Sequence, residues 1–165
     1  MSRRADLRPT ITVAAIAERD GKYLVIEERI RGRLVITQPG GHVEDRETLL
    51  EAIMRETLEE SAYAFEPNYL VCTYLMRDPA TGHSSLRFNF AGSVAGPDCR
   101  RALDTGIERA LWMSRDELHH AAARLRSPLV LRALSDYESG MRSPLESVQY
   151  LDLDSASHVR SVVSF

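Results

Sequence analysis

Long apolar runs, an excess of positive charge and paired cysteines are all missing from this sequence. The longest apolar run in residues 1–20, residues 13–17, is too short for a signal-peptide core or a membrane span. The formal net charge of −3 argues against the basic patch that binds nucleic acid. Cys72 and Cys99 match no zinc or redox spacing, and without a secretion signal a disulfide is not expected. We therefore expect a cytoplasmic protein that binds neither membrane nor nucleic acid.

The chain also lacks an internal repeat, a low-complexity run and an inter-domain linker. Its 165 residues fit one domain with a substantial core. An apolar content of 44% and a charged content of 27% are typical of a soluble globular protein. We expect one domain over residues 1–146, followed by a C-terminal tail or arm over residues 147–165, where the sequence is polar and weakly patterned.

The most informative part of the chain is residues 40–63, where a glycine turn leads into a helix rich in glutamate. Apolar side chains recur there at helical spacing and predict one buried face. The residues of this face are Leu50, Ile53, Met54, Thr57 (through its methyl) and Leu58.

Three carboxylates share one edge of the same helix. At about 100° per residue, Glu56, Glu59 and Glu60 fall close together, beside the apolar face. Unpaired, they repel one another, and Arg55 offsets only part of that repulsion. A hard divalent cation, bound through oxygen, would turn the acidic edge into a site. A solvated acidic face is the alternative.

The spacing of this stretch resembles the Nudix box, the signature of a family of hydrolases. The matching residues are Gly41, Glu47, Arg55, Glu56, Glu59 and Glu60. The sequence departs from the box at Ala62, where the family has a glycine that helps the helix to end in a left-handed turn. The resemblance implies an α/β/α sandwich with a mixed β-sheet, of the α/β class. It also implies cleavage of phosphoanhydride bonds in small molecules, with Mg²⁺ or Mn²⁺ as cofactor.

The resemblance further implies roles for single residues. The implied metal ligands are Glu56, Glu59, Glu60 and the carbonyl oxygen of Gly40. Arg55 would orient the carboxylates, and Glu47 would pair with Arg55 or hold the loop.

One more carboxylate is expected from the loop or strand that follows residue 96. Asp104 and Glu108 are the candidates, and we favour Glu108. The alternative is that these acids pair with Arg100 or Arg101. Glu56 or Glu108 would serve as the catalytic base.

Four residues outside the helix are candidates for binding substrate. Arg29 lies in an arginine loop, residues 29–33, that could hold phosphate by bidentate bonds, with a solvated loop as the alternative. Arg87 lies on the polar face of an expected strand and would bind phosphate if that face lines the cleft. Gln38 and His42 flank the glycines, and the alternative for His42 is packing against the loop.

Shorter matches point within the family to the bacterial NudJ-type phosphatases. These matches are Gln38-Pro39, Leu86-Arg87-Phe88 and Arg126-Ser127-Pro128-Leu129-Val130. The likeness implies stepwise release of orthophosphate from nucleoside di- and triphosphates and from thiamine-type pyrophosphates. An ADP-ribose or oxidised-nucleotide pyrophosphatase and a non-catalytic nucleotide sensor are the alternatives, and both a monomer and a homodimer remain open.

Strands and helices are expected to alternate along the rest of the chain. The expected strands are residues 10–17, 22–28, 34–37, 69–76, 85–94 and 107–113, and the expected helices are residues 114–126 and 128–139.

Overall fold

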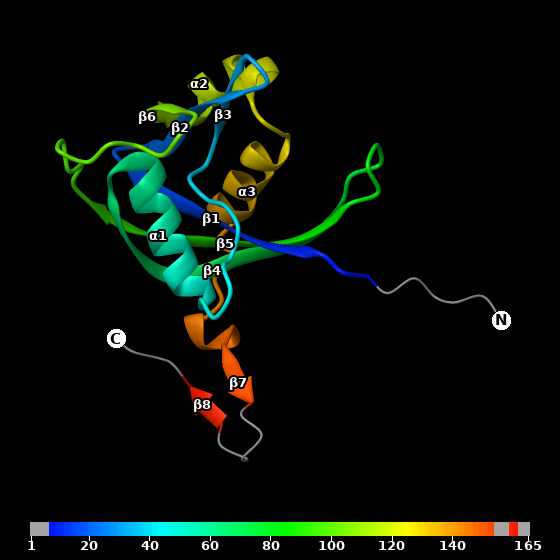
Figure 1. The fold of residues 1–165 in the computed structure, drawn as a ribbon. Helices are drawn as coiled ribbons and strands as arrows, with labels where there is room; N and C mark the ends of the chain where they lie inside the picture. The colour runs from blue at the N-terminus through cyan, green and yellow to red at the C-terminus, as the bar shows by residue number, and fades with distance from the viewer. Residues whose placement is uncertain (1–6, 154–158, 162–165) are drawn as a thin grey trace.

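The fold is a mixed β-sheet that lies between helices (Figure 1). The computed structural model describes residues 7–153 and 159–161. The strands of the sheet are β1 (Thr10–Arg19), β2 (Lys22–Ile30), β3 (Arg33–Thr37), β4 (Ala64–Arg77), β5 (Ser84–Ala95) and β6 (Ile107–Ser114). The helices are α1 (Leu49–Ser61), α2 (Arg115–His120) and α3 (Leu129–Glu138), with 3-10 turns at Ala122–Arg124 and Leu145–Ser147. No helix in the described residues has both the length and the apolar character needed to cross a bilayer.

Strand β1 is central to the sheet, whose order is β3-β2-β1-β5-β4, with β6 paired to β2. β1 and β5 run parallel, with Thr10 opposite Ser85 and Ala17 opposite Gly92. The other pairs are antiparallel. The sheet is therefore mixed, as predicted.

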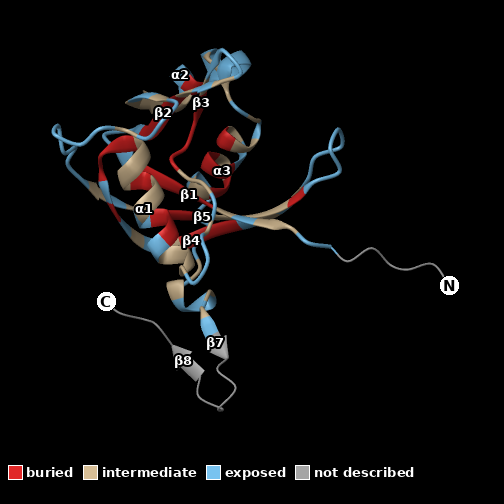
Figure 2. Cartoon of the chain, in the orientation of Figure 1, coloured by how far each residue is buried: buried red, intermediate tan, exposed pale blue. Residues whose placement is uncertain are grey.

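Side chains of β1 alternate between two cores, one on each face of the sheet. Val13 packs in a cluster that includes Ile53 of α1. Ile16 packs in a second cluster with Leu118 of α2 and Leu134 of α3. Figure 2 shows the buried residues concentrated in the central strands and in α3. Helices thus cover both faces, which confirms the predicted α/β/α sandwich.

Helix α1 begins and ends with defined caps. The Thr48 hydroxyl accepts a bond from the Glu51 N–H, and the Glu51 carboxylate accepts one from the Thr48 N–H, which is a capping box. At the other end, Ala62 has the left-handed conformation, with φ of 60°, and donates its N–H to the Leu58 carbonyl. Ala62 therefore forms the left-handed turn for which the Nudix box has a glycine.

The buried face of α1 differs from the prediction at Met54, which is 46% exposed. The residues buried on α1 are Ala52, Ile53, Thr57 and Ser61. The face is rotated because the glutamate edge of α1 also packs against the loop that contains Gly40 and Gly41, called the glycine loop below. There Glu60 accepts a hydrogen bond from Gly40.

The helix predicted over residues 114–126 is wrong beyond residue 120. α2 ends at His120, a single 3-10 turn follows, and Leu125 then forms a parallel bridge with Ile36 of β3. The N–H of Arg126 donates to the Ile36 carbonyl at 2.9 Å. Residues 125 and 126 thus pair with the edge strand β3 and do not continue the helix. Pro128 also disfavours a helical conformation at the residue before it, Ser127.

The C-terminal segment was expected to be a tail or arm from residue 147. In the structure, Val148 still packs against the core beside α1, so the folded body continues past residue 146. Beyond it, β7 (Leu151–Leu153) pairs antiparallel with β8 (Val159–Ser161), apart from the main sheet (Figure 1).

Candidate active site

The glycine loop before α1 is fastened to the central strand. The N–H groups of Ala15 and Val13 donate to the carbonyls of Pro39 and Gly41, both at 2.9 Å. The Gly40 carbonyl lies between these two and takes no part in the pairing. Gly40 has φ of 149°, and a Cβ on it would lie 2.2 Å from the Val13 carbonyl oxygen. Only glycine fits there, because any side chain would push the loop off β1.

Two glutamates of α1 lie directly against this loop. A Cβ on Gly41 would lie 2.5 Å from Oε1 of Glu56, so the absence of a side chain makes room for that carboxylate. The N–H of Gly40 donates to Oε2 of Glu60 at 2.7 Å. The loop and the helix therefore place two carboxylates and a main-chain carbonyl at one end of a cleft.

Arg55 links the acids to one another. Its Nε and Nη2 donate to the two oxygens of Glu47 at 2.7 and 2.8 Å, which is the predicted Glu47–Arg55 contact. Its Nη1 donates to Glu56 at 2.9 Å and to Glu59 at 3.2 Å, and Nη2 also donates to the His42 carbonyl. Such a guanidinium fixes the rotamers of the acids around it.

Burial shifts the pKa values of the two glutamates at the cavity. Burial raises the pKa of Glu60 to about 8, against the opposing effect of the Gly40 N–H. Burial also raises the pKa of Glu56, and the Arg55 guanidinium opposes that shift. Arg55 only partly offsets the burial of Glu56, and a bound cation would supply further positive charge to both carboxylates.

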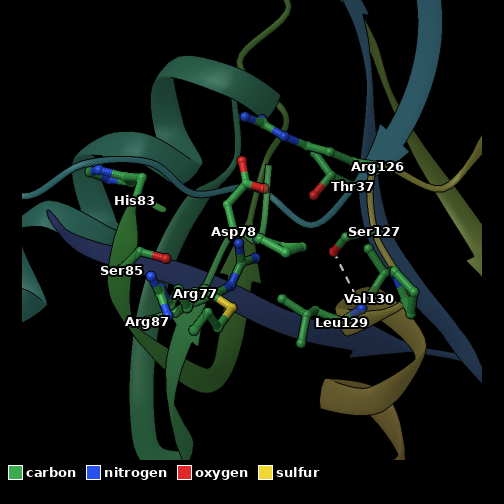
Figure 3. A pocket seen from close by; sticks show the side chains of 13 residues that line it. Thr37, Arg77, Asp78, His83, Ser85, Arg87, Arg126, Ser127, Leu129 and Val130 are labelled. Carbon is green, nitrogen blue, oxygen red and sulfur yellow. Dashed lines mark hydrogen bonds between the residues drawn. The ribbon is translucent and has the colours of Figure 1, made fainter. Parts of the chain in front are cut away.

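The cleft consists of two cavities that share a wall. One, of about 490 Å³, is lined by Gly40, Glu56 and Glu60 together with Arg87 and Arg126. The other, of about 620 Å³, shares Arg87 and Arg126 and continues past them toward the start of α3 (Figure 3). Arg87 and Arg126 thus line both cavities, whereas Glu56 and Glu60 line only the first and Asp78 lines the second.

The structure brings some of the predicted substrate residues to the cleft and leaves others away from it. Arg87 and His42 line the acid-containing cavity. Gln38 is buried in the loop, where its Nε2 donates to the Ala15 carbonyl at 3.3 Å. Arg29 lines neither cavity and pairs instead with Glu108, at 2.7 Å between Nε and Oε1.

Asp104 occupies the place that was expected of Glu108. Asp104 lines the cavity with Glu56 and Glu60, and its N–H donates to the Glu59 carbonyl at 2.9 Å. Glu108 is outside the cavity because it is held by Arg29. The geometry therefore favours Asp104 as the additional acid.

The donors at the acid end suit a hard divalent ion, although they are not assembled around one point. In the part of the chain that the structure describes, no three His, Cys, Asp or Glu side chains stand close enough to hold one ion together. Arg55 pairs with both Glu56 and Glu59, and Glu59 does not line the cavity that contains Glu56 and Glu60. Carboxylate and carbonyl oxygens are the ligands that Mg²⁺ and Mn²⁺ prefer, and among the residues that the structure describes the hydrogen-bond partner of Glu60 is the Gly40 N–H.

Arg126 and Glu28 line the cleft and were not among the predicted site residues. Arg126 was expected inside a helix, and the sequence signal for its true position was Pro128, which favours a break before it. Glu28 was expected at the end of a strand, beside the arginine loop whose Arg29 was the candidate for binding phosphate. In the structure Arg126 and Glu28 pair at 2.7 Å and both line the acid-containing cavity.

Several known proteins are similar to this chain in sequence and in fold. A family model described as NUDIX domain matches residues 6–134. Phosphatase NudJ of Escherichia coli (strain K12) is 37% identical over 141 residues, which are 86% of this chain and 91% of the relative. A NUDIX hydrolase from Nitrosomonas europaea has a TM-score of 0.85 and 43% identity, covering 89% of this chain and 100% of that one. A MutT NUDIX hydrolase from Burkholderia pseudomallei has a TM-score of 0.66 and 25% identity, over 78% of this chain and 98% of that one.

Proposed function

Because the chain belongs to the Nudix family of hydrolases, which act on phosphoanhydride bonds, we propose that it removes orthophosphate from nucleoside di- and triphosphates. Thiamine-type pyrophosphates are included in the proposed substrate class, Mg²⁺ is the proposed cofactor with Mn²⁺ as a substitute, and the cytoplasm is the proposed location.

The order of groups along the cleft is the observation that carries this proposal. The acids lie at one end, the two arginines lie in the middle, and the second cavity lies beyond them. That second cavity is lined in part by apolar side chains, among them Met76, Leu129 and Val130. This order suits a molecule with an organic group at one end and a diphosphate at the other, whose terminal phosphate reaches the acids.

The acid end would bind the divalent ion. Glu56, Glu60 and the Gly40 carbonyl would hold it, with Glu59 joining them once its contact with Arg55 is released, and the ion would neutralise phosphate oxygens and acidify water. Arg55 would keep Glu56 in position. Glu56 or Asp104 would accept the proton of the attacking water, since both line the cavity.

The proposed reaction takes place at the terminal phosphorus. A water oxygen forms a bond to that phosphorus, and the bond from phosphorus to the bridging oxygen breaks. The bridging oxygen leaves with the electron pair on the organic product, and the second product is orthophosphate. Fixed positive charge around the phosphates stabilises this transition state more than covalent help does.

The proposal is tested with a substrate panel, run with Mg²⁺ and then with Mn²⁺. Nucleoside di- and triphosphates, thiamine pyrophosphate and ADP-ribose are assayed separately for orthophosphate and for pyrophosphate. Orthophosphate release from the nucleotides is the expected result. Pyrophosphate release, cleavage of ADP-ribose alone, or tight binding without turnover would each overturn the proposal.

Replacement of Glu60 tests the acid end directly. Glu60→Gln is expected to lower orthophosphate release by about 100-fold or more, because an ion ligand supplies several kcal/mol to such a transition state. Glu44→Gln is the control, since Glu44 is exposed in the loop before α1 and lines neither cavity. A loss of only a few-fold in a folded Glu60→Gln variant would contradict the assigned role.

A further inference from the structure

We propose that Arg126 and Arg87 together clamp the phosphate next to the terminal one, which in a diphosphate carries the organic group, and that Glu28 holds Arg126 in place until substrate enters. The inference rests on the proposed function and adds to it the residues that select a diphosphate over a monophosphate. Arg126 then contributes to specificity and affinity, while the acids carry out the reaction at the neighbouring phosphate.

The position of Arg126 is fixed by its main chain. Its N–H donates to the Ile36 carbonyl at 2.9 Å, and the preceding Leu125 forms a parallel bridge with Ile36. From this anchor the side chain enters the cleft, where it lines both cavities. A guanidinium on a fixed backbone retains its place when its partner changes.

The present partner of Arg126 is Glu28, with 2.7 Å between Nη1 and Oε2. The Arg126 side chain is half exposed, and Glu28 lines the same cavity as the acids. A single-point ion pair at such exposure contributes little to stability, so an incoming phosphate can replace the carboxylate at small cost. Phosphate also offers the bidentate geometry that guanidinium prefers.

Arg87 is the second half of the clamp and has few partners of its own. Within the described residues, its side-chain hydrogen bond is from Nε to Oδ1 of Asn89, at 3.3 Å. Burial lowers the pKa of Arg87 to about 10, and the charge of Arg126 contributes to that shift. Arg87 and Arg126 line both cavities, and the ion-pair partner of Arg126 within the described residues is Glu28, so a phosphate that contacts both guanidinium groups would add a partner for Arg87.

The direction from which each arginine comes supports a clamp. Figure 3 shows Arg87 rising from β5, whereas Arg126 comes from the segment before α3. Both lie at the junction of the two cavities, past the acids. Because both arginines also line the second cavity, whereas Glu56 and Glu60 line only the first, we assign the clamp to the phosphate next to the terminal one, which in a diphosphate bears the organic group.

Binding of a non-hydrolysable nucleotide tests the clamp without turnover. The probe is α,β-methylene ADP in the presence of Mg²⁺, titrated calorimetrically into the full chain. Arg126→Gln is expected to weaken binding by about ten- to a hundred-fold, the range for loss of a charge-assisted hydrogen bond. Arg126→Lys keeps the charge but loses the bidentate geometry of the guanidinium. Its affinity for the probe is expected to lie between those of the wild type and of Arg126→Gln.

Arg132→Gln is the matched control. Arg132 lies on α3, six residues after Arg126, pairs with Asp136 and lines neither cavity. Its binding constant is expected to stay within two-fold of the wild-type value. Equal losses in the Arg132 and Arg126 variants would show a general effect of removing an arginine charge and overturn the proposal, as would an unchanged affinity in a folded Arg126→Gln variant.

Glu28→Gln separates a clamp from a structural ion pair. If Glu28 is only the resting partner, this variant is expected to bind the probe as tightly as the wild type or more tightly. If Arg126 acts only by positioning Glu28, both single variants lose affinity equally, which would overturn the proposal.

The same proteins distinguish failure of the clamp from failure of the proposed function. A wild type that binds the probe through Arg126 but hydrolyses no nucleotide removes the proposed function and leaves the clamp. A wild type that releases orthophosphate, with an unchanged KM in Arg126→Gln, removes the clamp and leaves the function. The clamp further requires KM to rise more than kcat falls.

Discussion

Glu60 is expected to lower the stability of the metal-free fold and yet to be required for activity. Its carboxylate is largely buried, and the partner it has is a single main-chain N–H. Burial raises its pKa to about 8, so the folded metal-free protein retains a proton that the unfolded chain releases at a much lower pH. A group buried at such cost is typical of a site that binds a ligand.

The free energy of unfolding should therefore respond to pH through Glu60. A carboxyl group with a raised pKa costs stability as pH rises from its ordinary value of 4.5 to about 8. Glu60→Gln cannot ionise, so without divalent ions it should be more stable than the wild type at pH 8, by on the order of 1–3 kcal/mol. Near pH 4.5 the two proteins should be equal.

Urea unfolding at several pH values, with and without Mg²⁺, measures this difference. Mg²⁺ should raise the midpoint of the wild type more than that of Glu60→Gln, because the variant lacks one of the proposed carboxylate ligands. Removal of the ion with a chelator should return the wild type to its metal-free curve. A Glu60→Gln variant that is less stable than the wild type at pH 8 would contradict the assigned cost.

At the scale of elements, the glycine loop and α1 form one unit. Gly40 approaches the backbone of β1 so closely that a Cβ would lie 2.2 Å from the Val13 carbonyl oxygen. The same residue donates its N–H to Glu60. The distance of the loop from β1 therefore sets the position of the carboxylates.

Gly40→Ala should displace this unit. The expected loss is about 2 kcal/mol or more in the free energy of unfolding, because the Cβ would meet backbone atoms that cannot move aside. Gly32→Ala is the control: Gly32 also has a positive φ, of 80°, but nothing lies within 4 Å of its Cβ. Its expected cost is about 1 kcal/mol, from the backbone alone. Thermal unfolding with and without Mg²⁺ measures both, and equal losses would show that the close approach does not matter.

Elements with a strong local signal could be predicted from the sequence, and the others could not. The spacing of Arg55, Glu56 and Glu60 identified α1 and the acids, because their chemistry depends on neighbours along one helix. Residues 121–126 continue a helical pattern locally, but the edge of β3 binds Leu125 and ends the helix. Arg126 was missed for the same reason, since its place in the cleft comes from a contact with Ile36, far away in sequence.

The partners of side chains on neighbouring strands could not be predicted from the sequence either. The sequence analysis favoured Glu108 over Asp104, but the pairing of β2 with β6 places Glu108 beside Arg29. Met54 has helical spacing with the apolar face, and it is exposed because α1 turns its acidic edge inward. Both errors come from packing between elements, which the spacing of residues along one helix or strand does not predict.

For the whole molecule, Glu27 fastens three elements at one buried point. Glu27 lies on β2 and is only 3% exposed. It accepts a bond from Nε of Arg109 on β6 at 2.5 Å and pairs with Arg124 of the 3-10 turn. Together these bonds join the sheet to the segment that carries Arg126 into the cleft, so Glu27 supports the site without touching it.

Loss of this carboxylate should lower stability in a pH-dependent way. The bond from Arg109 is the main cause that lowers the pKa of Glu27 below its ordinary value of 4.5, and Arg124 acts in the same direction. A carboxyl group with a lowered pKa stabilises the fold above that ordinary value, and the contribution is lost as pH falls through the folded pKa. Glu27→Gln should therefore be less stable than the wild type by about 1–3 kcal/mol at pH 7, and the two proteins should converge in acid.

Guanidinium unfolding between pH 7 and pH 3 measures that convergence. Glu108→Gln is the control, because its ion pair with Arg29 joins the same two strands but is about half exposed. Its cost should be below about 1 kcal/mol, as for other exposed ion pairs. If Glu27→Gln and Glu108→Gln lost the same free energy at pH 7, or if the Glu27 difference stayed constant into acid, the buried carboxylate would not be the fastening point, and the placement of Arg126 would have to come from the Ile36 contact alone.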